Sequence, residues 1–172
     1  MFPSLQLRAM AARPDNAAQT PADTLRILRR SVLGLFAIGI VGTAADLLLT
    51  GHVEDAWQLA PLGLFAASAL VIGWHLARGG RLSIRTHQAM MSLFILSGFV
   101  GTFLHYRANI EFEMEMYPGL AGFDLFWKAI QGASPPSLAP GTMIALGLLG
   151  LMYAYRHPAL DTEPTERLGA NP

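Results

Sequence analysis

The sequence predicts an all-α membrane protein, built as a four-transmembrane-helix bundle with a short interfacial helix in its last outer loop. Three observations support this prediction. Of the 172 residues, 52% are hydrophobic and only 14% are charged, whereas a soluble domain carries about 25% charge. Four apolar stretches are each long enough to cross the hydrocarbon core of a bilayer. The basic residues gather on one side of the topology that these stretches imply.

The predicted spans are about 31–49, 56–76, 88–106 and 138–155. The first of them, SVLGLFAIGIVGTAADLLL, has 19 residues. At about 1.5 Å per residue it reaches roughly 28 Å, close to the thickness of the bilayer core. The spans form one transmembrane domain over 25–156. A polar tail over 1–24 precedes this domain and a polar tail over 157–172 follows it.

The connections between spans differ in length: a turn over 50–55, a basic loop with a Gly-Gly turn over 77–87, and an outer loop over 107–137. In the outer loop, IEFEMEM alternates apolar and acidic residues, which is the period of a strand. A helical or irregular continuation is favoured, because a lone strand would have no partner. The later stretch FDLFWKAI repeats apolar side chains every three or four residues, which predicts a short helix lying in the membrane interface.

The basic residues indicate the orientation. Ten of the twelve lie before the first span, in the loop over 77–87 or after the fourth span, whereas the opposite side holds only Arg107 and Lys128. Because short cytoplasmic segments are enriched in Lys and Arg, both termini are predicted to be cytoplasmic. A single lysine among the twelve is typical of an arginine-rich bacterial composition, so we expect a bacterial plasma (inner) membrane.

Several classes of chemistry are excluded or left without a signal. The chain has no cysteine, which excludes disulfides, thiolate metal sites and a cysteine nucleophile. The net charge is zero, so no bulk basic surface indicates nucleic acid as a partner. The sequence also lacks G-x-S-x-G, Walker A and G-x-G-x-x-G motifs. The balance therefore favours a protein that is not an enzyme.

Polar residues near one end of the predicted bundle form a candidate site. The candidate metal ligands are Asp46, His52, Glu54, His105 and Glu111. Two imidazoles with carboxylates and no thiolate suit a divalent ion such as Zn, Mn, Fe or Cu(II). Ionisable residues inside spans are costly unless paired, so Asp46 and His105 are predicted to face the bundle interior together. The alternatives are a hydrogen-bonded packing pair, hydrated surface residues, or a proton or cation pathway through Asp46.

The histidines also fall at two levels of the predicted bundle. His52 and His105 lie at the outer end, and His75 and His87 lie at the inner end. Histidine pairs at two levels are what a two-haem b-type electron carrier needs. The alternative for the inner pair is contact with lipid headgroups beside the basic loop.

These patterns leave three functional hypotheses. The favoured one is a non-catalytic accessory or assembly subunit in the lipid bilayer, whose partner is another membrane protein or a second copy of the chain. The second is a metal-binding or metal-transport protein that uses the outer cluster. The third is a b-type haem protein or another membrane redox enzyme.

Overall fold

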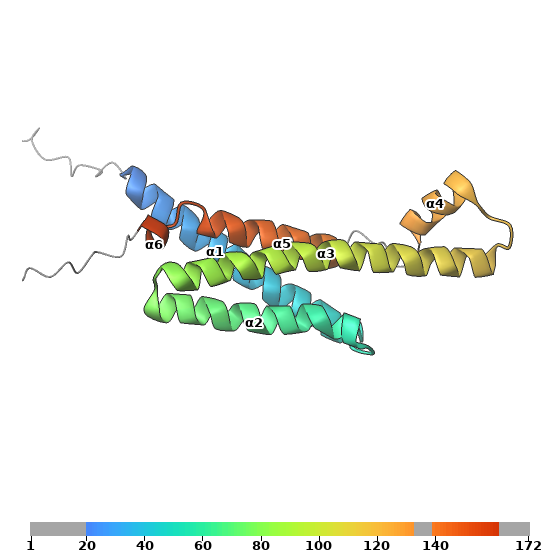
Figure 1. Cartoon of the computed structure of the whole chain (residues 1–172), viewed down its shortest axis with the longest axis horizontal. Helices are drawn as coiled ribbons and strands as arrows, with labels where there is room; N and C mark the ends of the chain where they lie inside the picture. Colours follow the sequence, from blue (N-terminus) through green and yellow to red (C-terminus); the bar gives the residue numbers. More distant parts are fainter. Residues whose placement is uncertain (1–19, 133–138, 162–172) are drawn as a thin grey trace, which may run out of the picture.

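The computed structural model describes residues 20–132 and 139–161, and within these residues it contains helices and no strands. The six helices are α1 (Pro21–Leu49), α2 (Ala56–Arg78), α3 (Arg81–Met116), α4 (Gly122–Gln131), α5 (Ala139–Ala154) and α6 (Pro158–Asp161). The predicted all-helical class is confirmed for the described residues. Figure 1 shows α1, α2, α3 and α5 as one elongated bundle, with α4 on the part of α3 that projects beyond the bundle.

Three of these helices, α1, α2 and α3, are long and apolar enough to cross a membrane. Only 11%, 17% and 17% of their most apolar windows are buried inside the chain. The rest of each apolar surface therefore needs lipid or another protein to cover it. The apolar helix α5 is shorter, with 16 residues.

Helices α3 and α5 form the closest pair in the bundle. A Cβ atom added to Gly98 would lie 2.6 Å from the Pro140 carbonyl oxygen, and one added to Gly147 would lie 2.8 Å from the Met91 carbonyl oxygen. These glycines let the two backbones approach each other closely, as small residues do between membrane helices. Because residue numbers fall along α3 as they rise along α5, the two helices are antiparallel.

Aromatic side chains fill the centre of the bundle. Phe36 and Phe94 are fully buried, and their ring centroids lie 6.0 Å apart. Phe65 of α2 packs on Phe94 at 5.6 Å. The cluster therefore joins α1, α2 and α3, and Met143 and Leu146 extend it to α5.

The connection between α2 and α3 is shorter than expected. The stretch over 77–87, predicted as a basic loop, is reduced to a turn at Gly79 and Gly80, whose φ angles of 61° and 102° suit glycine. The helical alternative for IEFEMEM is correct, because α3 continues to Met116. Its 36 residues reach about 54 Å, well beyond the thickness of a bilayer core.

Helix α4 folds back along this projecting part of α3. The side-chain amide of Asn109 donates a 2.9 Å hydrogen bond to the Ala129 carbonyl oxygen, and the rings of Tyr106 and Phe126 are in edge contact at 6.0 Å. A Cβ atom added to Gly132 would lie 2.8 Å from Asn109, so this glycine allows the close contact. Asn109 therefore holds α4 on α3.

Residues 157–161 pack on the bundle, although the sequence assigned them to the C-terminal tail. Ala159 and Leu160 contact a small core of Ile84, Tyr153 and Ala154. A guanidinium N–H of Arg29 donates a 2.8 Å hydrogen bond to the Arg156 carbonyl oxygen. The apolar side chains of PALD explain this packing, because they complete a core that α3 and α5 leave open. The other tail residues, 1–19 and 162–172, and residues 133–138 lie outside the described residues.

Candidate functional site

A cavity of about 860 Å³ lies between α2 and α3, and residues at the end of α1 and the start of α5 also line it. Figure 1 shows α2 and α3 close together at their turn and further apart toward the start of α2. Small residues line the wider part, including Ala60, Gly63, Ser97 and Gly101. Their side chains are too small to fill the space that the diverging helices leave.

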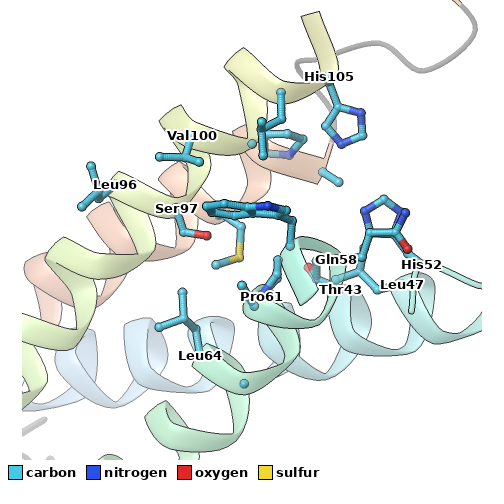
Figure 2. A pocket seen from close by; sticks show the side chains of 18 of the residues that line it. Thr43, Leu47, His52, Gln58, Pro61, Leu64, Leu96, Ser97, Val100 and His105 are labelled. Atoms are coloured by element: carbon cyan, nitrogen blue, oxygen red, sulfur yellow. The ribbon is translucent and has the colours of Figure 1, made fainter. Parts of the chain in front are cut away.

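The lining changes from apolar to polar along the cavity. Figure 2 shows Leu64 and Leu96 toward one end, and His52 and His105 at the other. Gln58 and Asp55 also line the cavity. The cavity therefore combines an apolar interior with a small polar group at one end, which is the usual composition of a small-molecule site.

His52 and His105 come together from distant parts of the sequence. His52 lies in the turn between α1 and α2, and His105 lies on α3. Their rings are nearly parallel, with 12° between the planes and 5.9 Å between the centroids. Both side chains are half-buried. Among the described residues, neither ring forms a hydrogen bond, in contrast to the other three histidines.

Local structure holds the turn that carries His52. The carboxylate of Asp55 accepts a 2.8 Å hydrogen bond from the Gln58 backbone N–H and so caps α2. The Gln58 side-chain oxygen accepts a 2.8 Å hydrogen bond from the Glu54 backbone N–H. The His52 backbone N–H donates to the Leu47 carbonyl oxygen at 2.8 Å. These bonds fix the chain on both sides of His52.

The structure separates the five candidate metal ligands. Only His52 and His105 meet. Glu54 is exposed, and Glu111 is exposed and paired with Arg107 at 2.9 Å. The prediction that Asp46 faces the bundle interior is wrong: Asp46 is exposed, and its neighbour Leu47 is the buried residue.

No group of three or more His, Asp or Glu side chains within residues 20–132 and 139–161 is arranged to hold a metal ion. A metal held by His52 and His105 alone would have one protein ligand fewer than a typical catalytic zinc site. The physical reason is that helical spacing places Glu111 on another face of α3 from His105, with Arg107 as its partner.

The opposite end of the bundle contains a larger histidine cluster. It consists of His75, His87, Tyr153 and His157, which we call the His87 cluster. The ring of Tyr153 contacts all three histidines, at centroid distances of 6.0, 5.5 and 5.3 Å. His75 and His157 lie 5.0 Å apart. Tyr153 and His157 were not predicted as members of this cluster, although their spacing of four residues at the end of α5 was available as a signal.

Hydrogen bonds define how the rings of this cluster are oriented. The Ser83 hydroxyl donates to the Gly80 carbonyl oxygen at 3.0 Å, so His75 Nδ1 donates to Ser83 Oγ at 2.8 Å. His87 Nε2 donates to the Gly150 carbonyl oxygen at 3.0 Å. In the described residues His87 Nδ1 is buried without a partner, which is acceptable for a neutral ring but costly for a charged one.

This geometry does not suit the haem hypothesis at the His87 cluster. Two axial imidazoles must direct ring nitrogens at one iron from opposite sides. Here the ring of Tyr153 packs against both His75 and His87, at centroid distances of 6.0 and 5.5 Å, and His87 is almost fully buried by the bundle. The cluster is therefore a packed polar core at one end of the bundle.

Comparison with known proteins gives no further guide to the site. No protein-family model, no curated protein and no solved structure matches the chain. The function is therefore inferred from the geometry of the two histidine groups and of the cavity.

Proposed function

We propose that the chain is a non-catalytic integral membrane protein that crosses the plasma membrane four times and holds a lipophilic molecule in the cavity beside His52 and His105. Both termini are cytoplasmic in this proposal. The observation that carries it is the cavity itself, because about 860 Å³ of apolar space ends at a few polar side chains. Ligand sites of this size are commonly built in this way.

Helix α5 is the fourth span in this proposal. Its 16 residues reach about 24 Å, slightly less than a typical bilayer core. Support comes from its antiparallel packing along α3 between Gly98 and His87. Since α3 is long enough to cross the membrane, a helix packed along the part of α3 between His87 and Gly101, which lies in the predicted third span, occupies the same layer.

The charge distribution supports the orientation. The end that carries the His87 cluster also carries Arg78, Arg81 and Arg85, all exposed. The end that carries His105 is followed by exposed acidic residues on α3. Positive charge favours the cytoplasmic side, so the cavity opens in the outer half of the membrane.

Helix α4 fits the membrane interface in this arrangement. Its Phe126 ring contacts Tyr106, which lies at the end of the predicted third span. Phe123 and Trp127 are exposed beside it, and aromatic side chains concentrate at this depth. The amphipathic helix therefore lies at the outer surface, where it can contact lipid headgroups.

A role as an accessory or assembly subunit is compatible with ligand binding. The weak burial of α1, with 11% of its apolar window covered by the chain, leaves most of this helix to contact lipid, a partner protein or a second copy.

Elemental analysis and a visible spectrum of the purified protein test the two cofactor alternatives, a bound metal ion and a bound haem. A stoichiometric metal or a Soret band that disappears in His105→Ala would favour those alternatives over the proposal.

Two glycines of α2 provide a matched test of the cavity. Gly63 lines the cavity and Gly73 does not, and a Cβ atom at either position meets nothing within 4 Å. Gly63→Leu should fill part of the cavity, whereas Gly73→Leu adds the same side chain elsewhere on the helix. Both variants are purified in a mild detergent, and the small molecules that remain bound are extracted and quantified by mass spectrometry.

The proposal predicts a lipophilic molecule near one per chain in the wild type and in Gly73→Leu, reduced at least several-fold in Gly63→Leu. The proposal would be contradicted if the extracts of the wild type and of both variants were the same and contained no molecule above the detergent background.

A further inference from the structure

We infer that the molecule held in the cavity has a neutral, ring-shaped head group with carbonyl oxygens and an apolar tail, the chemistry of an isoprenoid quinone. This inference rests on the proposed function and specifies the ligand class. It follows from three features of the cavity: the two imidazoles at its polar end, the indole in its lining, and the acidic surroundings.

The two imidazoles provide hydrogen bonds that nothing in the described residues uses. His52 and His105 are half-buried beside the cavity, and neither ring has a hydrogen-bond partner there. A neutral imidazole has one donor nitrogen and one acceptor nitrogen. The pair can therefore donate to a carbonyl oxygen, and it can accept from a hydroxyl if the head group is reduced.

The shape of the polar end favours a flat head group. The imidazole planes are nearly parallel, with 12° between them. The indole of Trp57 also lines this cavity. Aromatic faces bind flat rings by offset stacking or edge contact, so these three side chains favour a ring over a flexible head group.

The surroundings oppose an anionic head group. Asp55 lines the cavity. Asp46, near the end of α1, and Glu54, in the turn that follows α1, are both exposed. The nearest basic residue along α3, Arg107, is paired with Glu111 at 2.9 Å. A carboxylate or phosphate would meet like charges with no free cation among these residues, which costs free energy.

The interior of the cavity suits an apolar tail. Leu64, Leu93 and Leu96 line it together with Val100 and Met143. In the proposed orientation these side chains lie deeper in the membrane than the histidines. The head group would then lie at the level of the lipid headgroups, and the tail would extend toward the middle of the bilayer.

Trp57 provides a direct probe, because quinones quench tryptophan fluorescence at short range. The chain has three tryptophans. Trp74→Phe with Trp127→Phe leaves only Trp57, and Trp57→Phe with Trp74→Phe leaves only Trp127 on α4 as a control for quenching by quinone dissolved in the micelle. Both proteins are titrated in detergent with a benzoquinone that carries a decyl tail.

The inference predicts saturable quenching of Trp57 and weak, linear quenching of Trp127. His105→Leu, and likewise His52→Leu, in the Trp57 background should weaken the apparent affinity roughly five- to tenfold, as expected for the loss of one hydrogen bond. Gly63→Leu should abolish the saturable phase. Decylbenzene, which has the tail and no carbonyl oxygen, should compete poorly.

The failure of this inference differs from the failure of the proposed function. Saturable quenching that an excess of decylbenzene or of a fatty acid reverses completely, with no effect of either histidine variant, would overturn the quinone head group and leave the cavity as a lipophile site. Linear quenching of Trp57 that matches that of Trp127 would overturn the quinone inference. If Gly63→Leu and the wild type also retain the same extracted molecules, the proposed function fails too.

Discussion

His105 and His87 lie on the same helix about five turns apart, and their surroundings differ in almost every respect. His105 is half-buried beside a cavity, and its ring has no hydrogen bond within the described residues. His87 is 1% exposed, donates to the Gly150 carbonyl oxygen and packs on Tyr153. A buried ring that is hydrogen-bonded through one nitrogen and packed on aromatic side chains stabilises the fold. A half-buried ring beside a cavity, with no hydrogen bond at either nitrogen, is available to a ligand.

The packing of α3 explains why the two ends differ. At the His87 end, α2 turns into α3 through two glycines, and residues 157–161 cover the remaining opening. At the His105 end, α3 continues past the bundle, and within residues 20–132 and 139–161 no equivalent segment closes the space toward α2. The same residue type therefore has a packing role at one end and a proposed recognition role at the other.

The largest difference is expected from removing the two rings. His87→Ala deletes a buried side chain, its hydrogen bond and its contacts with Phe36 and Tyr153. This change should lower the free energy of unfolding by about 3 kcal/mol. His105→Ala should lower it by less than about 1 kcal/mol, because the ring is half-buried and unbonded. Thermal or denaturant unfolding in detergent measures both. Equal losses in the two variants would contradict the comparison.

Two glycines of the same bundle test the difference in packing density. An alanine at Gly150 would overlap Met91, a fully buried side chain with little room to move, and would lie 3.3 Å from His87 Nε2. An alanine at Gly101 would lie 3.3 Å from two Pro140 ring carbons beside the cavity. We expect a loss of about 2 kcal/mol for Gly150→Ala and less than about 1 kcal/mol for Gly101→Ala. The same unfolding measurements apply, and a larger loss for Gly101→Ala would show that the His105 end is the denser one.

A smaller effect is expected from pH at the His87 cluster. Burial lowers the pKa of the His157 imidazole below its usual value of 6.5, and the neighbouring His75, Arg29 and His87 lower this pKa further. The unfolded chain therefore takes up a proton at a higher pH than the folded chain does. Stability should be full above pH 6.5 and should fall as the pH decreases through the lower, folded-state pKa.

The melting temperature between pH 8 and pH 5 measures this dependence. His157→Gln should reduce the slope, because the variant keeps a polar side chain that does not titrate. A melting temperature that rises on acidification, or a slope that is unchanged in His157→Gln, would contradict the contribution of His157.

The sequence predicted the helices more accurately than the contacts between them. The apolar stretches predicted an all-helical protein, and the doubtful alternation in IEFEMEM was settled correctly by asking whether a strand would have a partner. The glycines at 79 and 80 were recognised as a turn, but the flanking basic residues were taken for loop. Arginine and histidine are tolerated in helix ends, so charge alone does not end a helix there.

The candidate site could be predicted only in part, because it depends on how helices pack in space. The pairing of His52 and His105 followed from connectivity, since both lie at one end of the bundle. The exposure of Asp46 did not follow, because a shift of one residue on α1 decides whether Asp46 or Leu47 faces inward. The cavity could not be predicted from the sequence, because it arises where α2 diverges from α3 and not from a sequence motif.

The most direct test of the two-ended arrangement is to locate four positions relative to the membrane. The chain has no cysteine, so single cysteines can be introduced at exposed positions without background: Val53→Cys and Asp124→Cys at the His105 end, and Ala77→Cys and Asp161→Cys at the His87 end. Intact cells are treated with a membrane-impermeant maleimide before and after permeabilisation. The four-span arrangement predicts labelling at 53 and 124 in intact cells, and at 77 and 161 only after permeabilisation. Labelling of position 161 together with 124 in intact cells would contradict a fourth span, and labelling of 77 together with 53 would contradict the placement of the two histidine groups on opposite sides.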